Sequence, residues 1–151
     1  VPREFYTRRF ALEDSQHIGE GSGWIVLGTR PQHAIGEMLG VRMLSLPFNE
    51  SSATAIARVA RELVGSAERA TLLGGCRMQS DELDRIAAVA DFSRTPAYLA
   101  TTGIFPTAIA LAMTSELLRP RAQSSTFVHV NRDDAGGRIA MLAFRAHADA
   151  S

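Results

Sequence analysis

The single cysteine, Cys76, is the first residue whose chemistry could define a site. It follows the glycine pair Gly74-Gly75 and precedes a helix that we expect to begin near Ser80. A thiolate between a turn and a helix N-terminus can have a lowered pKa, which favours a nucleophile. However, no histidine lies near it in the sequence, and a free cysteine usually behaves as a small buried hydrophobe. We therefore expect Cys76 to be structural, with catalysis as the less favoured alternative.

The other residues that could bind a metal lack a suitable pattern. Four histidines are spread along the chain: His17, His33, His129 and His147. Their spacing is not that of metal ligands, and no Cys/His pairing typical of zinc is present. We interpret each as a surface or strand-end residue. Asp133 and Asp134 stand before Gly136, where two acids are typical of a turn. The sequence therefore predicts no metal.

A glycine-rich run, Gly-Glu-Gly-Ser-Gly at residues 19–23, superficially resembles a dinucleotide-binding loop. That loop follows a strand and opens a helix, whereas this run precedes the apolar residues 24–27. Its glycines are better explained by close backbone approach at a sheet edge. We therefore predict no cofactor.

Periodicity places these residues on alternating strands and helices. The clearest helix begins at Ser51 or Ser52, carries Ile56, Val59 and Leu63 on one face, and ends at Gly65. Strands are predicted over residues 23–29, 41–46, 70–73, 96–100, 126–130 and 138–144, the last two forming a hairpin. Further helices are predicted over residues 31–39, 80–90 and 107–118, the last apolar on nearly all sides. This alternation is typical of an α/β layer with a mostly parallel or mixed sheet.

Composition excludes several classes of protein. The chain has 151 residues, which suits one domain over residues 1–151, and its sixteen basic residues balance its sixteen acidic ones. We therefore expect no nucleic-acid partner. No segment is long and apolar enough to span a membrane. All the basic residues are arginine, so no lysine can form a Schiff base. One cysteine excludes an intrachain disulfide and is compatible with the cytoplasm.

Four stretches resemble the C-terminal half of β-ketoacyl synthases and their chain-length-factor relatives. Arg-Phe-Ala-Leu-Glu-Asp at 9–14, with the glycine run and apolar strand over 19–27, resembles the segment that opens that half. Residues 75–77 with Glu-Leu-Asp-Arg at 82–85 are similar to the His-Gly-Thr loop and its helix, and look most like chain-length factors. The third stretch, Thr-Gly at 102–103 together with residues 108–118, resembles the Thr-Gly-His segment of the family and the buried helix that follows it. The fourth stretch, residues 136–142, resembles the final Phe-Gly-Gly-Thr-Asn strand.

The resemblance implies a thiolase-like half-domain, a five-stranded mixed sheet with helices packed on it. It also implies that the active-site cysteine of the family lies in the other half. The first family histidine falls at about Gly75 or Cys76, and the second at about Thr101 or Ile104. None of these is His or Asn, so nothing there can stabilise an enolate as imidazole does. We therefore expect that the chain is not an independent condensing enzyme.

These departures favour an accessory role. The resemblance implies a catalytically degenerate subunit that pairs with a thiolase-fold partner, a ketosynthase or another copy, in polyketide or fatty-acid biosynthesis. Acyl carrier protein is a further partner that this role implies. Interface candidates on the predicted 107–118 helix are Ala108, Leu111, Ala112 and Met113. The alternative is an enzyme acting on an acyl thioester, or one half of a split synthase completed by an N-terminal-half partner.

Overall fold

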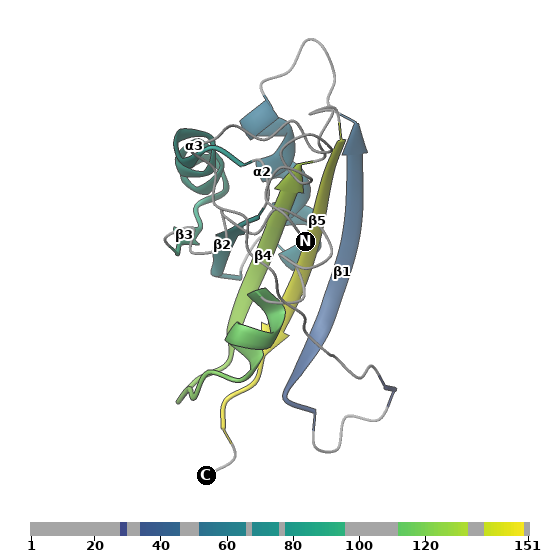
Figure 1. The fold of residues 1–151 in the computed structure, drawn as a ribbon, viewed down its shortest axis with the longest axis vertical. Helices are drawn as coiled ribbons and strands as arrows, with labels where there is room; N and C mark the ends of the chain where they lie inside the picture. Colours follow the sequence, from purple (N-terminus) through teal and green to yellow (C-terminus); the bar gives the residue numbers. More distant parts are fainter. Residues whose placement is uncertain are drawn as a thin grey trace, which may run out of the picture.

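A five-stranded mixed sheet forms the centre of the protein in the computed structural model (Figure 1). The structure describes residues 28–29, 34–45, 52–65, 68–75, 78–95, 112–132 and 138–149. The strands are β1 (Gly36–Ser45), β2 (Ala70–Gly74), β3 (Ser93–Arg94), β4 (Ser125–Arg132) and β5 (Arg138–Ala146). Their order across the sheet is β1-β5-β4-β2-β3. The predicted mixed sheet with helices packed on it is confirmed.

The two directions within the sheet follow from the connections. β4 and β5 are antiparallel neighbours, as the predicted hairpin requires, and β1 pairs antiparallel with β5. β2 runs parallel to β3, to which α3 (Ser80–Ala90) connects it, and it also runs parallel to β4. The strands β2 and β4 therefore end at the same edge of the sheet, with Gly74 beside Val130.

Two helices, α2 (Ser52–Val64) and α3, cover one face of the sheet. α2 lies behind the sheet in the view of Figure 1. Ile56 of α2, Ile86 of α3 and Leu72 of β2 are fully buried in the larger core cluster. Gly65 ends α2 with a φ of +82°, a left-handed conformation that glycine adopts without strain. Both helices match their predicted ranges because each has one apolar stripe at helical spacing.

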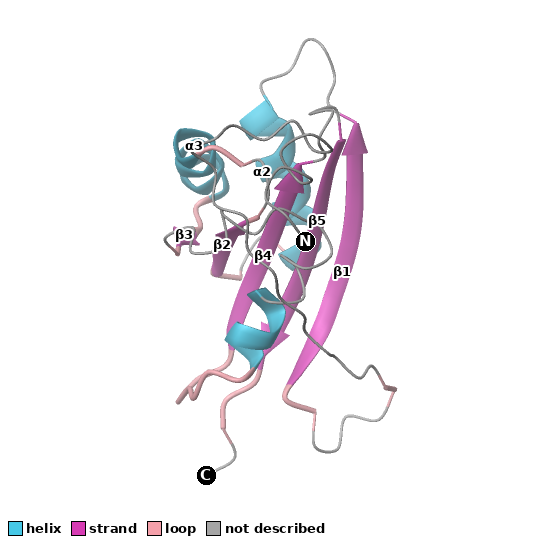
Figure 2. Cartoon of the chain, viewed as in Figure 1, coloured by secondary structure: helices cyan, strands magenta, loops and turns pink. Residues whose placement is uncertain are grey.

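The opposite face carries a second apolar cluster under the helical residues 112–117, which lie in front of β4 and β5 in Figure 2. The rings of Phe127 and Phe144 stack there with centroids 5.2 Å apart. Ala112 and Met113 pack against them and are buried. The predicted burial of this helix against the sheet is confirmed for residues 112–117.

The helix predicted over residues 31–39 is wrong where the structure describes it. Residues 36–39 belong to β1, a ten-residue strand that also includes the predicted strand residues 41–45. Pairing with β5 overrides the local signal: Glu37 lies opposite Arg145, far away along the chain. Gly36 and Gly40 weaken the helical alternative, because glycine is a poor helix former. Of the strand predicted over residues 23–29, residues 23–27 lie outside the described residues, and residues 28–29 are described but do not belong to a strand. The strand predicted over 96–100 also lies outside the described residues.

One ion-pair network ties β1, β4 and β5 together. Arg145 donates to both carboxylate oxygens of Glu68, at 2.8 and 2.9 Å, and also pairs with Glu37. Thr126 on β4 donates its hydroxyl to Glu68. That hydrogen bond and the Arg145 guanidinium hold the pKa of Glu68 below its ordinary value.

We expect Glu68→Gln to lower the free energy of unfolding by about 1 kcal/mol at pH 7, because the amide cannot replace the charged acceptor. Because the folded pKa of Glu68 lies below its unfolded value, this stabilisation is present above pH 4.5 and is lost as pH falls through the folded pKa. Urea unfolding at pH 7 and pH 3 measures both effects. Glu62→Gln, in an exposed pair with Arg58 at 3.9 Å, is the matched control and should change little. An equal loss in both variants would contradict the network's role.

Of the helices in the described ranges, none is long and apolar enough to cross a membrane.

Candidate functional site

A buried polar pair lies near the end of β4, on the face that also carries residues 112–117. His129 and Asn131 are both fully buried. The side-chain amide nitrogen of Asn131 lies 2.7 Å from Nδ1 of His129. Within the described residues, Nε2 of His129 is buried and has no hydrogen-bond partner. Buried polar atoms are nearly always hydrogen-bonded in proteins, so this pair is the clearest candidate for a function.

Gly75 lies directly against the pair. A Cβ atom at residue 75 would collide with the Oδ1 atom of Asn131 and would lie 2.6 Å from Cε1 of His129. The amide of Gly75 donates to the carbonyl of Val130 at 2.8 Å, which fixes this close approach. Glycine is therefore required here for space: any larger residue would displace the imidazole or the amide.

The electrostatic environment keeps the imidazole neutral. Burial lowers the pKa of His129 from 6.5 to about 4, because the charged form loses its hydration. Its nearest neighbours by strand register are Leu73 on β2 and Leu142 on β5, both apolar. At pH 7 the site therefore offers hydrogen-bonding groups without a net charge.

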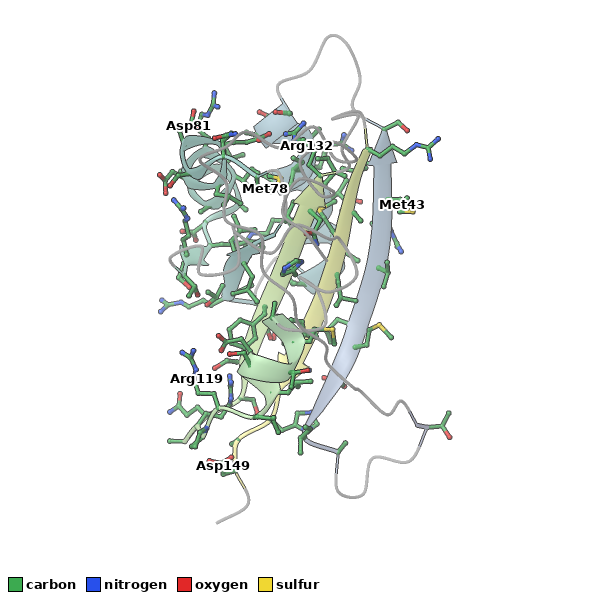
Figure 3. The ribbon with its side chains drawn as sticks, in the orientation of Figure 1. Met43, Met78, Asp81, Arg119, Arg132 and Asp149 are labelled. Carbon is green, nitrogen blue, oxygen red and sulfur yellow. The ribbon has the colours of Figure 1, made fainter. Side chains whose placement is uncertain are left out.

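A charged cluster lies at the same end of β4, on the side of α2 and α3. Glu82, in the first turn of α3, pairs with Arg132 and accepts a hydrogen bond from Ser52 at 2.8 Å. Figure 3 shows Arg132, Met78 and Asp81 together at this end of the molecule. Ser52 belongs to α2, Glu82 to α3 and Arg132 to β4, so the cluster connects these three elements through the buried Glu82 carboxylate.

The predicted site residues are only partly within the described part of the chain. Gly75 is described and lies directly against His129 and Asn131. Cys76, Thr101 and Ile104 lie outside the described residues. The interface candidates Ala108 and Leu111 also lie outside them. Ala112 and Met113 are described: they belong to the helical residues 112–117 and pack in the chain's own core against the sheet.

The interpretation of His129 as a surface or strand-end residue is wrong. It lies inside β4 and is fully buried, on the same sheet face as Phe127. One sequence signal could have found the pair: His129 and Asn131 are two residues apart in an otherwise apolar strand, which places both side chains on one face. His147, in contrast, directly follows β5, as expected for a strand-end residue. Within the described ranges, His, Cys, Asp and Glu side chains form no group of three or more that could hold a metal ion.

An apolar row on β1 forms a second candidate surface. Met38, Val41 and Met43 lie opposite Phe144, Leu142 and Ala140 of β5. They therefore share the sheet face of the second core cluster. Their exposed fractions are 46%, 50% and 67%, and Figure 3 shows Met43 on the outer side of β1. Among the described strands, β1 is an edge strand with β5 as its single neighbour.

Neither a protein-family model nor a curated protein matches this chain. A solved structure with a similar fold is that of a tetronic acid condensing enzyme, with a TM-score of 0.50 and 11% sequence identity. The likeness covers 74% of this chain and 47% of that one, so the chain spans about half the length of this structural neighbour. It is consistent with the expected thiolase-like architecture. The protein is therefore an α/β domain whose mixed five-stranded sheet is similar in fold to part of a condensing enzyme.

Proposed function

We propose that this chain is a ketosynthase-like subunit that lacks a complete condensing site and works by pairing with a thiolase-fold partner. The single observation that carries the proposal is the exposed apolar row Met38, Val41 and Met43 on the edge strand β1. The fold of the tetronic acid condensing enzyme supports the family context, and the matched part is about half of that enzyme.

The two faces of the sheet differ in how much apolar surface they leave exposed, and the second face leaves room for a partner. α2 and α3 cover the first face with a continuous core. On the second face, residues 112–117 cover Phe127 and Phe144, whereas the β1 row is exposed. The resemblance implies that halves of the thiolase fold pack against each other through shared buried helices, and the helical residues 112–117 lie on this face. A partner seated there would extend the existing apolar cluster across β1, at about 25 cal/mol per Å² of buried apolar surface.

An unpaired strand edge adds a second attraction. β1 has ten residues, and its outer row of N–H and C=O groups is not paired with another described strand. Such an edge readily accepts a strand from another chain. In the assembled complex, this subunit would shape an acyl tunnel in polyketide or fatty-acid biosynthesis, as chain-length factors do, with acyl carrier protein as a further partner.

The test is co-expression of the chain with the proteins encoded beside its gene, followed by purification and identification of what stays bound. We expect a thiolase-fold subunit in a stable complex. A complete ketosynthase as the partner supports the accessory role. An N-terminal-half partner with an active-site cysteine, and condensation only by the complex, would favour the split synthase. A chain that stays monomeric with all these proteins present would refute pairing.

The apolar row predicts which substitution breaks the complex. We expect Met43→Glu to weaken association at least about tenfold, because a buried, unpaired carboxylate is costly at an interface. The isolated chain should keep its thermal stability, because Met43 is 67% exposed. Val89→Glu is the matched control: Val89 is 58% exposed on α3, away from the β1 row. Light scattering and titration of the purified partner measure the effect. Equal affinity of both variants would exclude β1 as the interface.

A further inference from the structure

The hydrogen bond between Asn131 and His129 fixes where the imidazole proton lies. The amide nitrogen of Asn131 can only donate, so Nδ1 of His129 must accept. A neutral imidazole then carries its proton on Nε2. The atom without a partner in the described part of the chain is therefore an N–H donor, fixed in orientation by Asn131.

Leaving such a donor unsatisfied is expensive. A buried donor without an acceptor loses its hydrogen bonds to water without replacement, and a leucine or methionine at residue 129 would avoid this cost. Gly75 adds a second constraint, because space for the imidazole and the amide exists only without a side chain at that position. The pair also lies toward the carboxyl ends of the parallel strands β2 and β4, the edge where open α/β sheets bind ligands.

We propose that Nε2–H of His129, held by Asn131 and accommodated by Gly75, binds the oxygen of an uncharged carbonyl ligand. The ligand must offer an acceptor, because the free group is a donor, and a carbonyl oxygen is a strong uncharged acceptor. The ligand must be uncharged, because Leu73 and Leu142 flank the imidazole and no described register neighbour could supply a counter-charge to a buried anion. The lowered pKa of His129 agrees, since the imidazole stays neutral at pH 7. A ketone, ester or thioester carbonyl with an apolar chain meets these requirements.

This site is independent of pairing through β1, so the test uses the isolated chain. The probes are 2-octanone, which has an uncharged carbonyl, and octanoate, which has the same chain length and a carboxylate. Each is titrated into isotope-labelled protein while the imidazole resonances of His129 are followed by NMR. We expect 2-octanone to shift the Nε2 resonance in a saturable way, and octanoate to bind at least about tenfold more weakly.

Two variants of similar side-chain size separate the hydrogen bond from packing. His129→Gln keeps an N–H donor, whereas His129→Met has none. Loss of one hydrogen bond of about 1.4 kcal/mol predicts about tenfold weaker binding of 2-octanone to the methionine variant, with the glutamine variant closer to wild type. Thermal unfolding confirms that each variant is folded.

Three results would overturn the proposal. The first is an Nε2 resonance of wild-type His129 that does not move at saturating 2-octanone. The second is equal affinity of the methionine variant and the wild type. The third is tighter binding of octanoate than of 2-octanone, which would refute the uncharged class of ligand. The wild-type titration decides the proposal even where a variant fails to fold.

Discussion

Ala112→Arg is expected to unfold the domain. Ala112 is 0% exposed and packs against the second apolar cluster around Phe127 and Phe144. A guanidinium placed there would overfill a packed core and bury an unpaired charge, which together cost at least several kcal/mol. Single domains are stable by only about 5–15 kcal/mol, so most of the folded population should be lost. Circular dichroism during urea unfolding measures the loss.

Ser115→Arg is the matched control, because Ser115 is exposed on the same helical segment, residues 112–117. It introduces the same charge three residues away and should change stability by less than about 0.5 kcal/mol. A folded Ala112→Arg protein with wild-type stability would show that this helix does not pack on the sheet as described. Similar loss in both variants would instead point to a general effect of added positive charge.

Elements with a strong local pattern could be predicted from the sequence. α2 and α3 have one apolar stripe each, with polar residues elsewhere, and β4 and β5 are largely apolar runs separated in the sequence by polar residues. β1 could not be predicted in full. Its residues 36–39 depend on pairing with β5, about a hundred residues later in the chain, and local propensity carries no information about that pairing.

The candidate site was less predictable than the fold. The family resemblance points to Gly75 by its place in a motif, and the structure gives this glycine a role in providing space beside His129 and Asn131. The histidine itself was missed, because no histidine is near residue 75 in sequence while β4 brings one beside it in space. The absence of imidazole at the family positions therefore does not mean the absence of imidazole from the region.

The free energy of unfolding is expected to rise with pH between about pH 4 and 6.5, because His129 titrates differently in the folded and unfolded chain. Burial lowers the pKa of this residue from 6.5 to about 4 in the folded protein. In that window the unfolded chain binds a proton that the folded chain excludes, so lowering the pH favours unfolding. Each pKa unit corresponds to 1.36 kcal/mol, which gives a total effect of about 3 kcal/mol and about 2 kcal/mol between pH 7.5 and 5. Urea unfolding at these two pH values measures the difference.

His129→Gln should remove most of this pH dependence, because glutamine does not titrate. His147→Gln should keep it, because His129 is still present. The contribution of Glu68 has the same sign but is confined to lower pH, because the pKa of Glu68 lies below 4.5. The interval from pH 7.5 to 5 therefore separates the contribution of His129 from that of Glu68. A wild-type protein equally stable at both pH values would mean that His129 can be protonated without unfolding. The imidazole would then have to reach water or an acceptor in the folded state, and the dry environment described for His129 would be wrong.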